Sequence, residues 1–325
     1  MKNRRLSRKS RARNYFKQQK MWLVWLGLGL LAAVFIFCSF RIGHYVGGYL
    51  ASRQVSEEMQ GVNREAQSTP VPQAVTPEET PSGDDAVSTA MPFGTVAPQY
   101  GGKSMLPVVQ YPLNKYAHVS ERFRKLQQQN KDIVGWLNIE GVIDEAVVQR
   151  DNEYYLRRDY KGYHNQNGAI FLDENCQLKT RPYALILYGH NMKSGAMFGF
   201  MRHYQTLGFY QNHPFVTFDT AYEDGKYVIF AVGTVSTKAY DRDYLDLAKL
   251  SASTVSWRRE EIQTLHTKSI YTNTIDVQPD DQVLLLMTCV SDETERQVIA
   301  ARRIRDDETE KELMERVQRV RKKAY

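Results

Sequence analysis

The sequence predicts a mainly β fold, a barrel or a sandwich with a few helices, that follows one transmembrane helix and a stalk. Three observations predict this order. Residues 21–40 carry no charge, residues 51–107 are rich in Pro, Gln, Ser and Thr, and eight short β-rich runs follow, separated by turns that contain Gly, Asn or Asp. With 325 residues, of which 42% are hydrophobic and 25% charged, the chain is long enough for at least one globular domain.

The first 40 residues predict a membrane anchor. Residues 1–20 contain nine Lys or Arg and no acid, and residues 21–40 would span roughly 30 Å as a helix, the thickness of a bilayer's hydrocarbon core. The apolar run is longer than that of a cleaved signal peptide, no small-residue cleavage site follows it, and no lipobox-like stretch precedes Cys38. We therefore expect a single-pass signal anchor in the cell membrane, with residues 1–20 cytoplasmic and the remainder extracellular.

After the anchor, the composition predicts a stalk. Eight of the eleven prolines lie between Pro70 and Pro112, and such a segment cannot bury enough apolar surface to offset the entropy lost on ordering. We expect the stalk over residues 41–110, a globular domain over residues 111–306 and a charged helix over residues 307–325. The net charge of +6 is smaller than the surplus of nine in the basic tail, so the rest is slightly acidic and no nucleic-acid partner is expected.

The globular part begins with an amphipathic helix for which Ser120 is the expected N-cap. The β-rich runs that follow are GWLNI, AVVQR, AIFL, ALILYG, FVTFDT, KYVIFAVGTVS, QVLLLMT and RQVIAARRI. A longer helix is expected at about residues 251–268, between the late strands. The C-terminal helix opens acidic and closes basic, as the helix dipole favours, and its narrow apolar stripe is expected to dock on the domain: Leu313, Met314, Val317 and Val320.

Two strand ends carry the residues with the clearest chemistry. His190 ends the apolar run ALILYGH beside a glycine, and Cys289 ends the run LLLMTC, whereas Cys176 lies in a polar stretch where a surface thiol is expected. Arg296 follows Cys289 by seven residues, and the polar segment between them predicts a hairpin in which the two positions converge. The simpler interpretation is a buried thiol and a solvated arginine. The reactive interpretation is a cysteine nucleophile, a histidine acid and base, and an arginine that holds an oxyanion.

Four motifs favour the reactive interpretation. They are DIVGWLNIEGVIDEAVVQRDNEYYL (132–156), GAIFLD (168–173), YGHNMKSGAMFGFM (188–201) and TCVSDETERQVIAARRI (288–304). In these motifs, and in a helix placed between the late strands, the chain from about Glu121 to Ile304 resembles the sortases, membrane-anchored cysteine transpeptidases of Gram-positive bacteria, and class B in particular. The resemblance implies a closed sortase-type β-barrel with an N-terminal helix, a helix between late strands and a C-terminal helix.

The resemblance also implies roles for individual residues. Cys289 would be the nucleophile that forms a thioester, His190 the general acid and then the base, and Arg296 the group that positions substrate and stabilises the oxyanion. Secondary substrate-binding residues would be Asn152, Leu156, Tyr188, Met287 and Thr288. Met287 stands where the family usually has a serine close to the substrate, and because a thioether cannot donate a hydrogen bond, the preferred motif should differ. The family uses no metal or organic cofactor.

The implied function is that of a thiol-protease-type hydrolase and transpeptidase in cell-wall anchoring. Its partners would be secreted proteins with a C-terminal sorting signal, and the amine of a peptidoglycan precursor or a pilin. Two alternatives stay open beside it: a pilus-polymerising sortase, against which the charged C-terminus argues, and a non-catalytic scaffold of the same fold that binds a peptide by strand addition. A simple peptide hydrolase would use the same residues.

Overall fold

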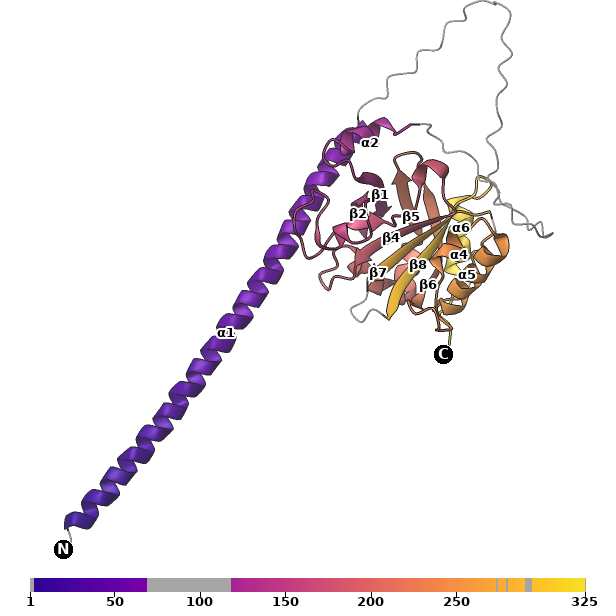
Figure 1. Cartoon of the computed structure of the whole chain (residues 1–325). Helices are drawn as coiled ribbons and strands as arrows, with labels where there is room; N and C mark the ends of the chain where they lie inside the picture. The colour runs from indigo at the N-terminus through magenta and orange to yellow at the C-terminus, as the bar shows by residue number, and fades with distance from the viewer. Residues whose placement is uncertain (1–2, 69–117, 273, 279, 290–293, 325) are drawn as a thin grey trace, which may run out of the picture.

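The computed structural model describes residues 3–68, 118–272, 274–278, 280–289 and 294–324. Its strands are β1 (Ile133–Ile139), β2 (Ile143–Val148), β3 (Ile170–Leu172), β4 (Ala184–His190), β5 (Phe215–Thr220), β6 (Lys226–Ser236), β7 (Val283–Cys289) and β8 (Glu295–Arg303). They form a closed barrel in the order β1-β2-β3-β4-β7-β8-β6-β5 (Figure 1). The eight predicted β-rich runs and the predicted barrel are confirmed.

Helices surround the barrel and fill its connections. The α-helices are α1 (Asn3–Ser68), α2 (Glu121–Leu126), α3 (Leu207–Asn212), α4 (Leu247–Ser251), α5 (Val255–Lys268) and α6 (Glu310–Gln318), and the 3-10 helices are η1 (Tyr154–Arg157), η2 (Leu178–Thr180) and η3 (Phe198–Gln205). The predicted cap of α2 is confirmed, because the Ser120 side chain accepts a hydrogen bond from the Phe123 amide. The helix expected at residues 251–268 corresponds to α5.

The strands β4 and β7 form the centre of the barrel wall. They are parallel neighbours, and residues 184–188 of β4 and 283–288 of β7 are buried without the alternation of a half-exposed strand. Such continuous apolar runs are typical of strands covered on both faces. The parallel β4–β7 pair joins segments about 100 residues apart in the chain, so the two strand ends with His190 and Cys289 come together only through the barrel.

The N-terminal helix differs from the expected stalk. The stalk was predicted from residue 41, but α1 continues unbroken to Ser68 and its last turns contact the barrel (Figure 1). The cause is an apolar stripe at three- and four-residue spacing, Val55, Met59, Val62 and Ala66, which the polar composition of this stretch conceals. Met59 is only 1% exposed. The rest of the predicted stalk, from residue 69 on, lies outside the described residues.

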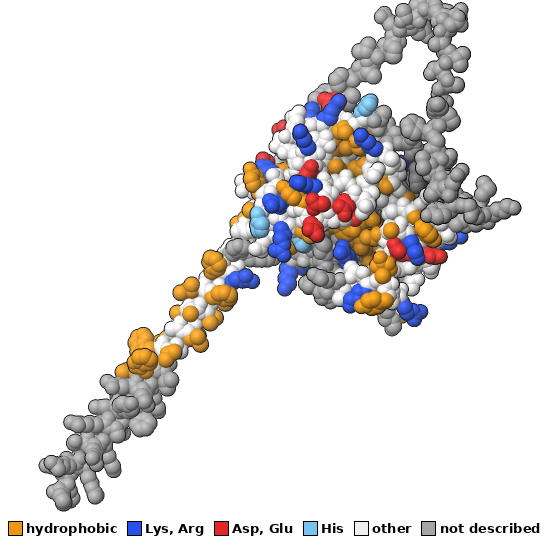
Figure 2. Space-filling model, in the orientation of Figure 1, with side chains coloured by type: hydrophobic (Ala, Val, Ile, Leu, Met, Phe, Trp, Pro, Cys, Tyr) orange, Lys and Arg blue, Asp and Glu red, His pale blue; other side chains and the backbone are white. Residues whose placement is uncertain are grey.

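Before this docked part, α1 presents its apolar side chains outward. Large apolar residues from Met21 to Leu50 are exposed, and Figure 2 shows them along the helix between its N-terminal part and the barrel. By length and composition, α1 contains a stretch that could cross a membrane.

The C-terminal helix docks as its stripe predicts. Leu313, Val317 and Val320 are buried, and α6 begins with a capping box between Thr309 and Glu312. An ion-pair network ties this end of the chain to the barrel, because the fully buried Arg302 of β8 bonds both carboxylate oxygens of Glu308 at 2.5 and 2.6 Å.

Cys176 is not the surface thiol that its polar surroundings predict. It is 4% exposed, its thiol lies 3.5 Å from the carbonyl of Ala184, and burial raises its pKa to about 12. The polar stretch folds back against the barrel because Gln149 donates to the carbonyl oxygens of both Asp173 and Cys176. A thiol with this pKa is a poor nucleophile at neutral pH.

Candidate active site

The sheet register aligns the three predicted catalytic positions. In the parallel β4–β7 pair, His190 is the register partner of Cys289. In the antiparallel β7–β8 pair, Val283 pairs with Arg302 and the register runs regularly to Met287 and Val298. Continuing it by two residues places Arg296 opposite Cys289, and a 3.3 Å hydrogen bond from the Gln297 amide to the Thr288 hydroxyl holds the strands together beyond the last paired residues.

The three positions therefore form one row across three neighbouring strands, His190 on β4, Cys289 on β7 and Arg296 on β8. The hairpin expected between Cys289 and Arg296 agrees with the antiparallel pairing of β7 and β8, and its turn, residues 290–293, lies outside the described residues. Side chains at directly opposed positions of a sheet lie on one face. We refer to these three positions as the catalytic row.

The ring of His190 is held by the backbone. Its Nε2 lies 2.7 Å from the carbonyl oxygen of Leu156, at the end of η1. A carbonyl oxygen can only accept, so this contact is a hydrogen bond in the tautomer that carries its hydrogen on Nε2, which leaves Nδ1 free of that bond. The predicted residue Leu156 thus contacts the catalytic row through its backbone.

Arg296 lies against an aromatic ring. Its guanidinium carbon is 5.4 Å from the ring centroid of Tyr188, which lies two residues before His190 and therefore on the same face of β4. The ring is 5% exposed, so most of this cation–π contact is removed from water. Burial, together with the nearby Asp173, raises the pKa of the Tyr188 hydroxyl, which therefore stays protonated and available as a donor.

Hydrogen bonds extend from Tyr188 to a second predicted residue. The Tyr188 hydroxyl donates to Asp173 Oδ2 at 3.1 Å, and Asn152 Nδ2 donates to the same oxygen at 3.0 Å. The side-chain oxygen Oδ1 of Asn152 in turn accepts from the Glu174 backbone amide at 3.0 Å. Sequence reasoning did not select Asp173, although it ends the quoted GAIFLD motif. Asn152, Asp173 and Tyr188 thus form a connected support for Arg296 of the catalytic row.

Met287 and Thr288 lie on opposite faces of β7. Met287 is the register partner of Tyr188 and Val298 and is 3% exposed, so it forms part of the buried floor beside the catalytic row. Thr288 is fully buried, and strand alternation directs it away from the face of Cys289. Contact of either side chain with substrate stays a prediction. Among the described residues, no three His, Cys, Asp or Glu are grouped as metal ligands would be.

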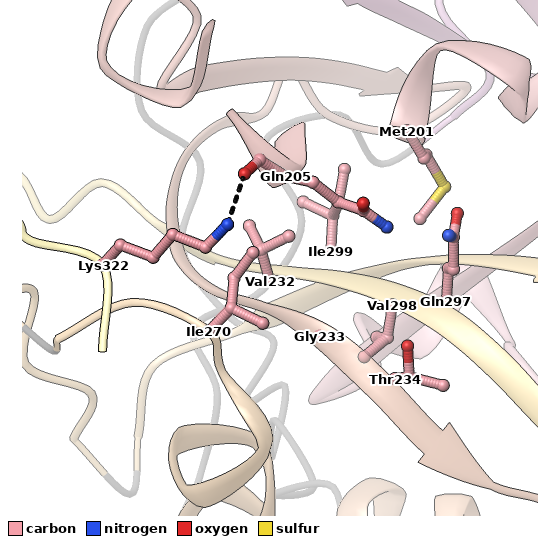
Figure 3. A pocket seen from close by; sticks show the side chains of 10 residues that line it. All are labelled: Met201, Gln205, Val232, Gly233, Thr234, Ile270, Gln297, Val298, Ile299 and Lys322. Carbon is pink, nitrogen blue, oxygen red and sulfur yellow. Dashed lines mark hydrogen bonds between the residues drawn. The ribbon is translucent and has the colours of Figure 1, made fainter. Parts of the chain in front are cut away.

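A separate cavity of about 310 Å³ is lined largely by residues of β6 and β8 (Figure 3). Gln297 and Thr234, which line it, are register partners and share the face of Thr288. Neither His190 nor Arg296 lines it. The residues that do are Met201, Gln205, Val232, Gly233, Thr234, Ile270, Gln297, Val298, Ile299 and Lys322. The cavity is therefore distinct from the catalytic row.

Residues 139–304, a little over half of the chain, match the family model of the sortase domain. The chain belongs to the sortase family. It is 33% identical to sortase B of Listeria monocytogenes over 178 residues, which cover 54% of this chain and 70% of that protein.

Solved structures agree with class B. A Bacillus anthracis protein described as similar to sortase B superimposes with a TM-score of 0.57 at 26% identity, over 79% of this chain and 97% of that one. The Staphylococcus aureus sortase B–substrate complex gives a TM-score of 0.51 at 28% identity, over 58% and 88% of the two chains. The chain is thus a class B sortase, and the class is one of cysteine transpeptidases.

Proposed function

We propose that this sortase cleaves a C-terminal sorting signal of secreted proteins through a thioester on Cys289 and transfers the acyl group to an amine of the cell envelope. The observation that carries the proposal is the catalytic row, in which register alone brings Cys289 opposite both His190 and Arg296. The solved substrate complex of Staphylococcus aureus sortase B, which shares this fold, supports substrate binding by the barrel.

Each residue of the row has one task in the proposed reaction. The Cys289 thiolate attacks the scissile carbonyl carbon, and the amide C–N bond breaks as His190 gives a proton to the leaving amine. The incoming amine then attacks the thioester, its proton passes to His190, and the sulfur leaves as thiolate. A new amide replaces the one cleaved, so no oxidant, metal or cofactor is needed to balance the two steps.

Arg296 acts on the charge that develops in both steps. Each step passes through a tetrahedral intermediate whose oxygen carries a negative charge, and a fixed guanidinium in a partly dry site stabilises this charge. The contact with the Tyr188 ring holds the guanidinium at the row before substrate arrives. Preorganisation matters because a donor that must first be ordered loses part of its benefit.

The location follows from the N-terminal helix. We propose that residues 21–40 anchor the chain in the cell membrane, with the basic residues 1–20 in the cytoplasm and the barrel outside. The exposed apolar side chains of this part of α1 support the anchor. On this topology, exported proteins and envelope amines reach the barrel from the outer side of the membrane.

The test is a product analysis with the full chain in detergent micelles. The enzyme is incubated with a library of sorting-signal peptides and either triglycine or a lysine-containing pilin-type peptide, and the products are read by mass spectrometry. We expect a peptide–amine conjugate that is absent with Cys289→Ala. Conjugation to the lysine peptide alone would favour the pilus-polymerising alternative, and cleavage without conjugate would indicate a hydrolase. If the folded protein forms no Cys289 adduct with any peptide, the result would favour the non-catalytic scaffold that binds a peptide.

A further inference from the structure

We propose that the loop of residues 191–197, which follows His190, faces the surface of the lipid bilayer, because α1 is one continuous helix from the membrane to the barrel. This inference rests on the proposed membrane anchor, but not on the proposed reaction. It concerns how the catalytic row is presented to the membrane, and it follows from three features of the described residues.

The first feature is that α1 is fixed to the barrel over several turns. Met59 is buried, and Gln60 donates to the backbone carbonyl of Asp144 at 2.8 Å. Ser52 accepts from Asn167 at 2.6 Å, and Asn63 accepts from Arg122 at 2.8 Å. These two polar contacts lie eleven residues apart, about 16 Å along the helix. Attachment over this length fixes the direction of the helix as well as its position.

The second feature is the part of the barrel beside the lower end of this attachment. A hollow of about 410 Å³ is lined on one side by α1, from Tyr49 to Gln60, and on the other by residues 142–145 and 194–197. The loop is itself closed, since Asn191 and Met197 form a β-bridge. Met197 also lines a smaller cavity with Ser52, Val55 and Ser56, so the loop lies beside residues 49–60 of the helix, while α2 contacts the helix farther along, at Asn63.

The third feature is the short length of α1 between the uncharged run and the start of the attachment. The uncharged run ends at Phe40, and the nine residues from Arg41 to Tyr49 cover about 12 Å of helix from first to last. The headgroup layer itself is about 5–8 Å thick. Along one stripe of this short connection, Ile42, Val46 and Leu50 are exposed. With the helix along the bilayer normal, the lower end of the hollow, at Tyr49, is thus on the order of 10 Å or less from the headgroups.

The direction of β4 indicates which end of the barrel lies nearer the bilayer. β4 ends at His190 beside this loop, and its seven residues extend about 20 Å away from it. The view in Figure 1 agrees, because the barrel sits beside the last part of α1 and the end of β7 lies on the side toward the N-terminal part of that helix. The catalytic row occupies these same strand ends, so it opens close to the bilayer rather than at the far pole of the barrel.

The chemistry of the loop fits the surface of a membrane. Lys193 is exposed, and it makes no ion pair with any residue that the structure describes. A lysine in this position can contact lipid phosphates, and a basic residue near an anionic leaflet contributes attraction that salt weakens.

The experiment measures depth directly and needs no substrate. The full chain, with Cys38→Ser and Cys289→Ala to remove competing thiols, carries one fluorophore at Lys193→Cys or at Lys179→Cys. These exposed lysines lie beyond opposite ends of β4, so they form a matched pair, and the buried Cys176 does not compete for label. The protein is placed in phosphatidylcholine–phosphatidylglycerol vesicles that contain headgroup-quencher lipids.

We expect the probe at Lys193→Cys to be quenched at least about twofold more than the probe at Lys179→Cys, because quenching falls steeply over the length of a strand. Ser194→Cys, which keeps the lysine, should repeat the result. Gly47→Pro breaks the helix between anchor and barrel, and should bring the two positions close to equal quenching.

Three results would overturn the inference. Equal quenching at the two ends of β4 would show that the loop does not face the bilayer. A difference that survives Gly47→Pro would show that the helix does not set the orientation. Failure of the chain to float with the vesicles would remove the anchor, and the proposed orientation with it. None of these outcomes depends on catalysis, so they are separate from failure of the proposed transpeptidation.

Discussion

The support beneath Arg296 can be tested by removing the Tyr188 ring and the Tyr188 hydroxyl separately. Tyr188→Leu removes the ring that lies 5.4 Å from the guanidinium carbon. A cation–π contact of this kind contributes about 1–2 kcal/mol when it is largely desolvated. If that energy holds Arg296 in place for the oxyanion, its loss corresponds to a fall of roughly 5- to 30-fold in kcat. KM should change less, because the oxyanion exists only in the transition state.

Tyr188→Phe is the matched control. It keeps the ring and removes only the hydroxyl, which donates to Asp173 at 3.1 Å. Asp173 still accepts from Asn152, so the loss should be about 1 kcal/mol of stability, with kcat within about threefold of the parent. Thermal denaturation measures the first quantity, and steady-state conjugation of the best library peptide to triglycine measures the second.

A double-mutant cycle decides whether the ring acts through the arginine. In an Arg296→Ala background, Tyr188→Leu should cause little further loss, because the group that it positions is already gone. Full additivity of the two losses would refute the positioning role. So would wild-type kcat in a folded Tyr188→Leu protein, or equal damage from Tyr188→Phe and Tyr188→Leu.

Three further predictions concern the scaffold. Burial raises the pKa of the Glu145 carboxyl from 4.5 to about 7. Because the folded protein binds this proton more tightly than the unfolded chain, the free energy of unfolding falls as pH rises from 4.5 to about 7. Glu145→Gln removes this group, so the urea midpoint should depend less on pH over that range. Gly189→Ala would place a methyl group 2.9 Å from the Phe198 ring, so we expect a loss of about 1–3 kcal/mol in chemical denaturation and a displaced strand end. Glu308→Gln removes the nearest carboxylate from the buried Arg302, whose other carboxylates lie 3.8 and 4.0 Å away, so the free energy of unfolding should fall by about 2–4 kcal/mol. An unchanged unfolding midpoint would contradict the assigned ion pair.

The sequence allowed the catalytic row to be predicted because its parts are marked locally. Apolar runs that stop at His190 and Cys289 indicate strand ends, and the polar residues before Arg296 indicate a turn. That the two runs are parallel neighbours with these residues in register could not be read from local pattern. It depends on the closure of the barrel, in which β7 pairs with a strand about 100 residues earlier.

Three features were missed because the local sequence conceals geometry. The segment 49–68 is polar on average, and only the stripe of Val55, Met59 and Val62 shows that one side of a helix is apolar. Cys176 is surrounded in sequence by polar residues, but the barrel provides Gln149 to bond its backbone and bury it. The role of Asp173 was missed for the same reason, since its value lies in joining Asn152 to Tyr188, which are distant in sequence.

The order of strands around the barrel has a consequence for how the protein acquires activity. β7 lies between β4 and β8, and β8 lies between β7 and β6, so the last two strands of the chain are the ones that close the barrel. Pairing between segments this distant in sequence is slow to form. Cys289 and Arg296 both arrive with these final strands, and they meet His190 only when closure is complete. On the proposed topology and reaction, a chain still being exported therefore carries its thiol without a partner, and transpeptidation begins only with the last step of folding.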